Sequence, residues 1–268
     1  MYDAGAPQVT SLIDTHAHLT VEQFDADRED VIRRAEESHV YAIVNVGTQM
    51  EDSLSGIELA EHYNFIHAAV GIHPQECGGI TEKNLEELAI LANHPRVVAI
   101  GEIGLDFHAD YAPREQQLYI LRRQLLLADK IHKPVLIHAR QADAEMRQVL
   151  QEWTSKRVHK NTPGVIHCFT STLDVAQAYI QMGFYISLGA YIGYPSSKAL
   201  REAIKLLSLD KLLVESDCPY LPPQRLRGHR NEPSYISDTV IELARLHGIN
   251  YEECAAHITA NSRQLFNI

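Results

Sequence analysis

Between residues 9 and 18 the chain reads VTSLIDTHAH. The first six residues, VTSLID at 9–14, predict a strand, and two histidines, His16 and His18, follow at its end. An open, doubly wound α/β sheet is expected to carry a glycine-rich phosphate loop after its first strand. The His-x-His sequence at this place favours a closed barrel, and the open sheet remains the alternative.

Seven further runs of apolar and β-branched residues predict strands, and longer stretches with helical spacing separate them. The runs cover residues 40–47, 65–72, 96–104, 134–139, 164–169, 184–189 and 211–217. Helices are expected at 81–93, after Pro113, up to Gly183, at 234–247 and at 251–265. Parallel strands need helical crossovers, and closing the sheet removes its exposed edges. We therefore predict an α/β fold, a single (β/α)8 TIM barrel with an additional C-terminal helix.

The domain organisation is expected to be simple. No stretch rich in proline, glycine and serine divides the 268 residues, so one domain is predicted over residues 11–268. Residues 1–10 are predicted to be an N-terminal extension. With 45% hydrophobic and 22% charged residues the chain can bury a sizeable core, which excludes a disordered protein.

The charge balance is acidic, with 35 acidic against 24 basic residues and a net charge of −11. This argues against a basic face that coats long nucleic acids, so a polyanionic substrate would need a local attraction such as bound cations. Four widely spaced cysteines argue against a thiolate zinc site and a disulfide framework. No signal-peptide pattern is visible, and no apolar run approaches the roughly 20 residues that span a bilayer. We therefore expect a cytoplasmic protein without a membrane partner.

Residues that can bind metals mark the predicted strand ends at a near-constant interval. The residues at the carboxyl ends of the eight strands are His16, Asn45, His73, Glu102, His138, His167, Leu188 and Asp217, mostly 28 or 29 residues apart. One βα unit of such a barrel takes about 31 residues, and barrel enzymes build their sites at these strand ends. Chance placement would scatter histidine and carboxylate residues over helices and the opposite loops. The spacing therefore predicts a site at one end of the barrel.

Together with His18, which shares the strand parity of His16, this pattern predicts a pair of metal ions. The predicted ligands are His16, His18, Glu102, His138, His167 and Asp217. Imidazole and carboxylate ligands suit two divalent ions such as Mg, Mn or Zn. With only two carboxylates the loaded site stays positive enough to attract phosphate. Two ions can also clamp the attacking and leaving oxygens of a displacement at phosphorus.

Neighbouring residues leave alternatives open. His73 is either a contact to a substrate phosphate or a histidine at the rim of the barrel. Glu215 shares the parity of Asp217 and either points inward or supports a ligand. Cys168 and Cys218 have the opposite parity and are expected to face the helix layer, which argues against a cysteine nucleophile.

These residues, in this order, resemble the TatD family of metal-dependent deoxyribonucleases. The matching strings are IDTHAHL at 13–19, VGIHP at 70–74, GEIGLDF at 101–107, PVLIHAR at 134–140, HCFT at 167–170, ESDCPYL at 215–221, RGHRNEP at 227–233 and TANSRQLF at 259–266. The resemblance covers nearly the whole chain. Ser171 is a departure, because the family usually has glycine there.

The resemblance implies a role for each part of the site. One ion would be held by His16, His18, Glu102 and Asp217. Glu102 would bridge to a second ion held by His138 and His167, and Asp217 would orient or deprotonate the attacking water. The residues implied as substrate contacts or as supports of the ligands are His73, Arg140, Arg227, Asn231 and Glu232.

The activity that the resemblance implies is that of a deoxyribonuclease with 3′→5′ exonuclease character. It would cleave phosphodiester bonds of single-stranded DNA or 3′ ends through a metal-activated water. The acidic charge suits this activity, because only a strand end has to enter the site. Two alternatives remain open. The same site could hydrolyse a carboxylic ester or amide, such as an aminoacyl ester on tRNA, or the chain could be a binding barrel without turnover.

Overall fold

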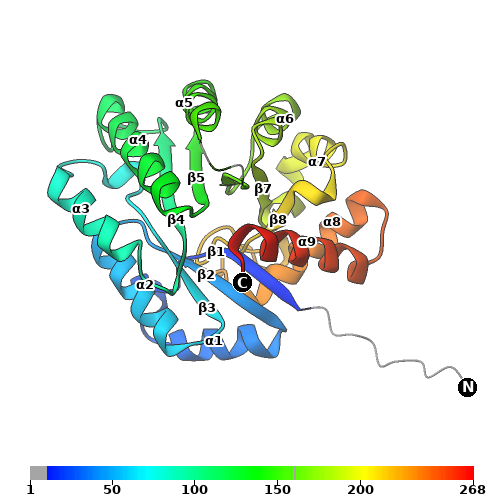
Figure 1. The fold of residues 1–268 in the computed structure, drawn as a ribbon. Helices are drawn as coiled ribbons and strands as arrows, with labels where there is room; N and C mark the ends of the chain where they lie inside the picture. Colours follow the sequence, from blue (N-terminus) through cyan, green and yellow to red (C-terminus); the bar gives the residue numbers. More distant parts are fainter. Residues whose placement is uncertain (1–10, 158, 160) are drawn as a thin grey trace, which may run out of the picture.

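The computed structural model describes residues 11–157, 159 and 161–268, and the predicted extension at 1–10 lies outside them. Eight parallel strands follow one another around a single sheet in the order β1 to β8 (Figure 1). Their bounds are β1 Leu12–Ala17, β2 Val40–Val46, β3 Ile66–Val70, β4 Val97–Asp106, β5 Val135–Arg140, β6 Gly164–Ile166, β7 Tyr185–Leu188 and β8 Leu212–Val214. The prediction of a (β/α)8 barrel is confirmed.

A helix follows each strand and lies on the outside of the sheet, and one more helix ends the chain (Figure 1). The bounds are α1 Arg28–Glu37, α2 Met50–His62, α3 Glu82–Leu91, α4 Arg114–Ile131, α5 Asp143–Lys156, α6 Leu173–Gln181, α7 Lys198–Ile204, α8 Ile236–His247 and α9 Tyr251–Phe266. Local sequence explains several ends: Thr81 and Asn84 form a capping box before α3, and Gly248 ends α8 with a φ of 68°. Within the described residues, no helix is both long and apolar enough to cross a membrane.

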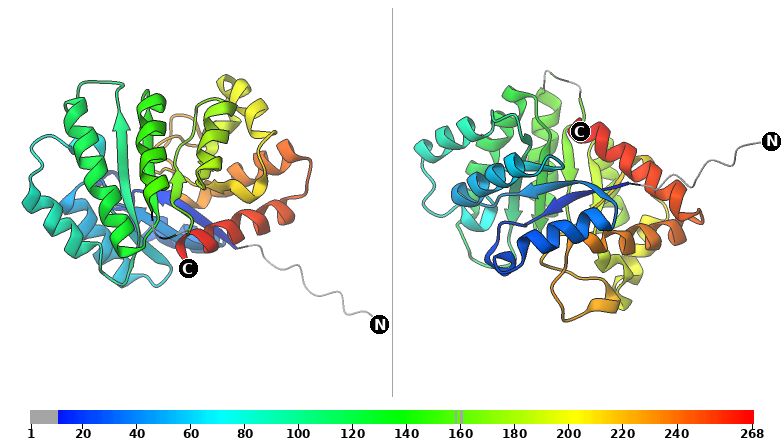
Figure 2. Two further views of the ribbon diagram at one scale, coloured as in Figure 1. Left: turned by 45° about the horizontal axis from the view of Figure 1, so that its top comes forward. Right: turned by 90° about the horizontal axis from the view of Figure 1, so that it is seen from below.

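Apolar side chains fill the inside of the barrel, and two residues of α9 complete this cluster. This inner cluster consists of Val44, Val46, Ala69, Ala99, Leu136, Val165, Tyr185, Leu213, Leu265 and Phe266. The last two residues belong to α9. Asn261, also on α9, donates hydrogen bonds to the carbonyl oxygens of Leu209 and Leu212 at 2.7 and 2.9 Å, at the beginning of β8. Helix α9 therefore closes the amino-terminal end of the barrel (Figure 2).

The opposite end of the barrel closes where the chain leaves β8 and meets the end of β1. The backbone N–H of Asp217 donates to the carbonyl of His16 at 2.9 Å, and the N–H of His18 donates to the carbonyl of Cys218 at 2.9 Å. These two bonds join the first and last strands at their carboxyl ends, beside the predicted metal ligands.

Five strands end two or three residues away from their predicted ends. β1 continues to Ala17, past the predicted end at residue 14, and β3 stops at Val70, before the predicted end at residue 72. β6 and β8 stop about three residues early, because the backbone turns to positive φ at Cys168 (46°) and Asp217 (55°), which a strand cannot accommodate. β4 instead continues to Asp106, past the predicted end at residue 104. The early ends of β6 and β8 place His167 and Asp217 in the turns just beyond these two strands.

Candidate metal centre

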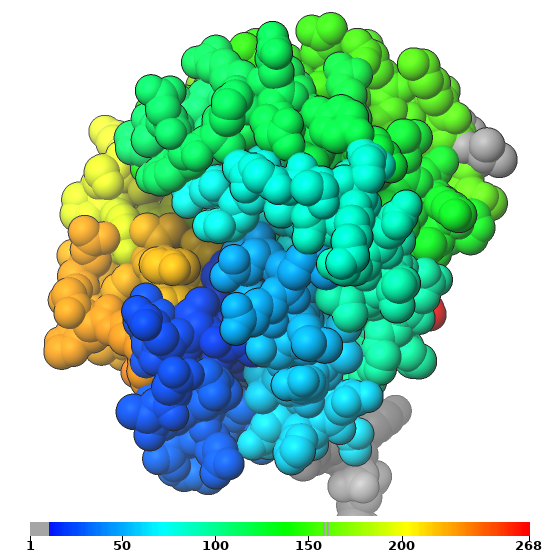
Figure 3. All heavy atoms as spheres, turned by 90° about the vertical axis from the view of Figure 1, so that its left-hand side faces the viewer, coloured from blue at the N-terminus to red at the C-terminus, as the bar shows by residue number. Residues whose placement is uncertain are grey.

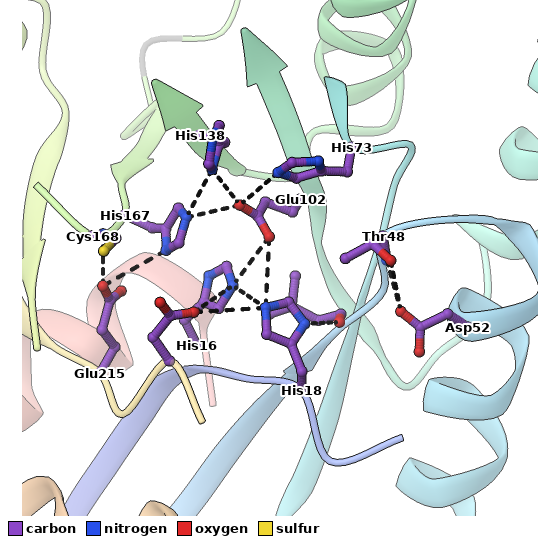
Figure 4. A network of polar contacts seen from close by, with 12 residues as sticks. His16, His18, Thr48, Asp52, His73, Glu102, His138, His167, Cys168 and Glu215 are labelled. Atoms are coloured by element: carbon purple, nitrogen blue, oxygen red, sulfur yellow. Dashed lines mark hydrogen bonds and ion pairs between the residues drawn. The ribbon is translucent and has the colours of Figure 1, made fainter. Parts of the chain in front are cut away.

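The six predicted metal ligands gather at the carboxyl ends of the strands, and Figure 4 labels all of them except Asp217. β1 brings His16 and its continuation His18, β4 brings Glu102, β5 brings His138, and the turns after β6 and β8 bring His167 and Asp217. With His73 they form three sets whose ligand atoms lie within 4.8 Å of one another: His16–Glu102–His167, His16–His18–Asp217 and His73–Glu102–His138. The strand periodicity thus brings together side chains that lie up to 201 residues apart in the chain.

One set of groups surrounds Oε2 of Glu102. The Nε2 atoms of His16 and His18 lie 3.1 Å from each other, and they lie 3.4 and 3.6 Å from this oxygen. Oδ1 of Asp217 is 3.9 Å from Nε2 of His16 and 3.7 Å from Nε2 of His18. Two imidazoles and two carboxylates therefore point at one common position.

A second set surrounds the other oxygen of the same carboxylate. Oε1 of Glu102 lies 2.8 Å from Nδ1 of His138, 2.8 Å from Nε2 of His167 and 3.4 Å from Nε2 of His73. The ring of His167 also stacks on the ring of His16, with centroids 3.9 Å apart. Glu102 therefore lies between two groups of imidazoles, one on each carboxylate oxygen. His73, for which the sequence left two interpretations, belongs to this second group by distance.

The protonation of these groups suits cation binding. Burial lowers the pKa of His16 to about 4, so the ring is neutral and able to act as a ligand at neutral pH. Burial alone would raise the pKa of Glu102, but the adjacent His167 and His73 hold it well below its usual range. An ionised carboxylate among imidazole nitrogens is a donor set that divalent metals accept. The residues present therefore fit bound metal ions.

Asp106, at the end of β4, was missed by the sequence analysis and supports His138. Its Oδ2 lies 3.3 Å from Nε2 of His138 and accepts a hydrogen bond from Nε2 of Gln75 at 2.8 Å, while Oδ1 accepts the N–H of His108 at 2.9 Å. Burial alone would raise the pKa of Asp106, but the hydrogen bonds from His138, His108 and Gln75 lower it. A histidine held by a carboxylate at one ring nitrogen presents the other to a metal. Strand alternation, which puts Asp106 on the same face as Glu102, was the available signal.

Glu215 takes a corresponding place behind His167. Its Oε1 is 3.6 Å from Nδ1 of His167 and accepts the backbone N–H of Cys168 at 2.6 Å. The side chain is fully buried and lies beneath the cluster, so it both points inward and backs a predicted ligand. Nε2 of His167 is thereby left to face Glu102.

A cavity of about 700 Å³ opens over the cluster, a volume within the usual range for small-ligand sites. The loops after β1, β3 and β8, which are blue, cyan and orange in Figure 3, meet on one face of the molecule. Arg140, at the end of β5, lines the cavity and is exposed. Within the part of the chain that the structure describes, its guanidinium group has no hydrogen-bond or ion-pair partner, which leaves it free to bind an anion.

The three predicted residues of the 227–233 loop do not line this cavity. Arg227 is exposed, with its guanidinium carbon 4.3 Å from the centre of the Tyr194 ring. Nδ2 of Asn231 donates to the carbonyl of Ser216 at 2.6 Å, directly before Asp217. Glu232 forms a bidentate ion pair with the guanidinium of Arg34 of α1. The two N···O distances are 2.8 and 2.9 Å. Asn231 therefore holds the segment that carries Asp217, whereas Glu232 joins the loop to α1.

The turn after β6 corrects one expectation about cysteines. Cys168 lines the cavity and does not face the helix layer, because its positive φ breaks the strand alternation on which the prediction rested. Burial raises the pKa of its thiol well above the usual range, so it is not a ready nucleophile. Cys218 is buried in the apolar core, as expected. Ser171, the departure from the family pattern, donates a hydrogen bond to Asp143 at the start of α5 at 2.6 Å.

A barrel with buried imidazole and carboxylate groups at its carboxyl end defines a class of protein, the metal-dependent hydrolases of (β/α)8 fold. A family model described as "TatD related DNase" matches residues 13–267. The chain belongs to this family, and its class of activity is the metal-dependent hydrolysis of ester bonds.

Individual relatives agree over nearly their whole lengths. An uncharacterized metal-dependent hydrolase, YabD of Bacillus subtilis, is 40% identical over 257 residues, which cover 96% of this chain and 99% of that protein. A Pantoea vagans protein named "3'-5' ssDNA/RNA exonuclease TatD" is 35% identical over 263 residues, or 96% of this chain and 100% of that one. The crystal structure of YjjV, a TatD homolog from Escherichia coli, matches with a TM-score of 0.91 and 31% identity, covering 97% and 100% of the two chains. These matches do not favour the alternative of a carboxylic ester or amide substrate.

Proposed function

We propose that this chain removes nucleotides one at a time from the 3′ end of single-stranded DNA, using two divalent ions, Mg, Mn or Zn. The observation that carries the proposal is the place of Glu102, whose two oxygens face two different groups of imidazole nitrogens. Displacement at a phosphodiester requires stabilisation of both the attacking and the leaving oxygen, and two cations that share a carboxylate can supply it. The Pantoea vagans relative is named a 3'-5' ssDNA/RNA exonuclease, which supports a single-stranded substrate and the 3′→5′ direction.

We assign the ligands from the two groups of side chains around Glu102. The first ion would be held by His16, His18, Glu102 and Asp217, and the second by Glu102, His138 and His167. When bound, the ions would supply Lewis acidity that activates a water and neutralises phosphate charge. Asp217 would accept the proton of the attacking water. Its Oδ1 lies 3.9 Å from Nε2 of His16 and 3.7 Å from Nε2 of His18, so this carboxylate stands beside the ligands of the first ion, where the water would be activated.

Other residues would bind and orient the strand. Arg140 lies at the edge of the cavity, and its guanidinium group has no partner among the described residues, so it would pair with a non-bridging phosphate oxygen. His73, whose Nε2 lies beside Glu102, would either contact the same phosphate or be a further ligand of the second ion. Arg227 lies further out and would contact the strand away from its end. A net charge of −11 is compatible with this mode of binding, because only a strand end approaches the positive centre.

The proposal is tested with a 5′-labelled single-stranded DNA oligonucleotide. The enzyme is stripped of metal and then supplied with Mg²⁺ or Mn²⁺, and products are followed over time on a sequencing gel. We expect a ladder that shortens one nucleotide at a time and is absent from the stripped sample. The variant Asp217→Asn should abolish the ladder while keeping the fold, whereas Asp110→Asn, an exposed carboxylate outside the cavity, should cleave like the wild type. Intact DNA with metal bound, or an active Asp217→Asn variant, would overturn the proposal.

Two further assignments accompany it. We propose that residues 11–268 form the whole catalytic domain, which the family match over 13–267 supports. Deletion of residues 1–10 should then leave the ladder unchanged. We also propose a cytoplasmic location, supported by four cysteines that all carry free thiols. Cell fractionation with an antibody to the protein would test it, and recovery in a secreted or membrane fraction would contradict it.

A further inference from the structure

A half-exposed aromatic ring stands at the edge of the metal centre. The side chain of Tyr220 is 50% exposed. Of the large apolar side chains that are exposed in the described residues, it alone lines the cavity over the cluster. Its ring centre lies 6.1 Å from that of His18, and the two planes are inclined by 69°. The ring therefore meets His18 in an edge-on contact and leaves much of its surface open to a ligand.

The position of this ring is fixed by the turn that also places Asp217. The backbone N–H of Tyr220 donates to the carbonyl of Asp217 at 2.9 Å, so one turn positions both residues. Val21 and Leu221, both partly buried, line the same cavity beside it. The cavity therefore has two chemically different parts, a polar centre suited to phosphate and an apolar wall with an aromatic face.

We propose that Tyr220 stacks on a nucleobase next to the scissile phosphate and is the part of the site that selects unpaired strand ends. This inference rests on the proposed function. A nucleotide joins a charged phosphate to a flat apolar base through one sugar, which matches a polar centre with an aromatic ring beside it. Stacking on a π-face accepts every base, and it requires a base that is free of its pairing partner. Tyr220 would thus give preference for single strands without preference for sequence.

The test compares two substrates and four proteins. One substrate is a 5′-labelled single-stranded oligonucleotide, and the other is the same strand with its last two 3′ nucleosides replaced by tetrahydrofuran abasic residues. The proteins are wild type, Tyr220→Ala, Tyr220→Phe and the control Tyr111→Ala, which removes an equally exposed ring outside the cavity. All are loaded with Mn²⁺, and kcat and KM are measured for the first cleavage.

We expect Tyr220→Ala to lower kcat/KM on the normal strand by roughly 5- to 150-fold, the range that stacking on one base is worth, mainly through KM. On the abasic strand, wild type and Tyr220→Ala should agree within about twofold, since no base is present to stack. Tyr220→Phe keeps the ring and should behave like the wild type, as should Tyr111→Ala. An equal loss on both strands would show that Tyr220 only maintains the turn, and a loss in Tyr220→Phe would assign the effect to the hydroxyl group. Either result overturns the stacking role.

The activity of the wild type separates a failure of the proposed function from a failure of the role of Tyr220. If the wild type leaves the normal strand intact, the proposed function is wrong, and the role of Tyr220 falls with it. If the wild type digests the normal strand and Tyr220→Ala digests it equally well, only the role of Tyr220 is wrong.

Discussion

Replacing Asp106 by asparagine probes whether a buried carboxylate behind His138 sets the metal affinity of the site. Three donors converge on its two oxygens, from His138, Gln75 and the backbone of His108. Asparagine offers one oxygen and one NH2 group, so at least one of these donors would face another donor. Even with its oxygen toward His138, the amide carries no charge, so the imidazole would lose the anionic partner that keeps Nδ1 directed at Glu102, where the distance is 2.8 Å. Losing such a support typically weakens metal binding 10- to 100-fold, or about 1.4–2.7 kcal/mol.

The assay is isothermal titration calorimetry of metal-free protein with Mn²⁺ and with Zn²⁺, followed by turnover at rising metal concentration. We expect Asp106→Asn to bind metal 10- to 100-fold more weakly and to recover turnover when metal is raised by the same factor. Asp110→Asn removes the same charge from an exposed site four residues along and serves as the control. A thermal melt establishes that each variant is folded. Metal affinity within twofold of the wild type, or a loss of turnover that saturating metal does not restore, would refute the reasoning.

The remaining predictions concern stability and pH. A Cβ at Gly104 would lie 1.9 Å from the carbonyl oxygen of His138, so Gly104→Ala should lower the free energy of unfolding in urea by about 3 kcal/mol or more. A smaller loss would mean that the backbone of β5 can shift to make room for the methyl group. Asn231→Ala removes the 2.6 Å bond to Ser216, which should cost about 1–3 kcal/mol in urea and lower kcat, and an unchanged kcat would separate the loop from catalysis. Chelation of the metals should lower the melting temperature, because a metal present at a free concentration of 100 times its Kd stabilises the folded protein by about 2.7 kcal/mol. An unchanged melting temperature would argue against tight metal sites. Burial lowers the pKa of His67 from 6.5 to about 4 in the folded protein. As the pH falls from 6.5 to 4, the imidazole is protonated in the unfolded chain before it is protonated in the folded one, so the free energy of unfolding should fall through this interval. His67→Gln should lose less stability over the same range, and identical urea midpoints against pH would contradict the shift.

The arrangement of the metal centre was predictable because it follows the symmetry of the barrel. Each βα unit returns the chain to the same height, so a spacing of mostly 28 or 29 residues was enough to align the strand ends. Alternation along a strand then distinguished inward from outward positions, as for His16 and His18. This logic holds only while the backbone is extended. It failed at Cys168, where a φ of 46° turns the side chain into the cavity.

Support for the ligands was less visible in the sequence, because it depends on contacts between distant segments. Asp106 was overlooked since β4 was expected to end at residue 104, and the carboxylate lies beyond it. Asn231 and Glu232 gave no sign of which partner they would find, and their contacts with Ser216 and Arg34 exist only once the loop folds back on the barrel. Sequence spacing specifies where a repeating element ends, whereas it leaves open what an irregular loop touches.

The closure of the barrel by α9 has a consequence for synthesis on the ribosome. The ligands at the end of β1 emerge first and Asp217 emerges near the end, yet the backbone bonds between His16 and Asp217 and between His18 and Cys218 join the two. Leu265 and Phe266, which complete the inner core, follow later still. A growing chain therefore carries most of its metal-binding residues without a finished barrel around them. The barrel interior can therefore close only after Leu265 and Phe266 have left the ribosome, and a chain that stops before α9 leaves an apolar interior open to chaperones and proteases.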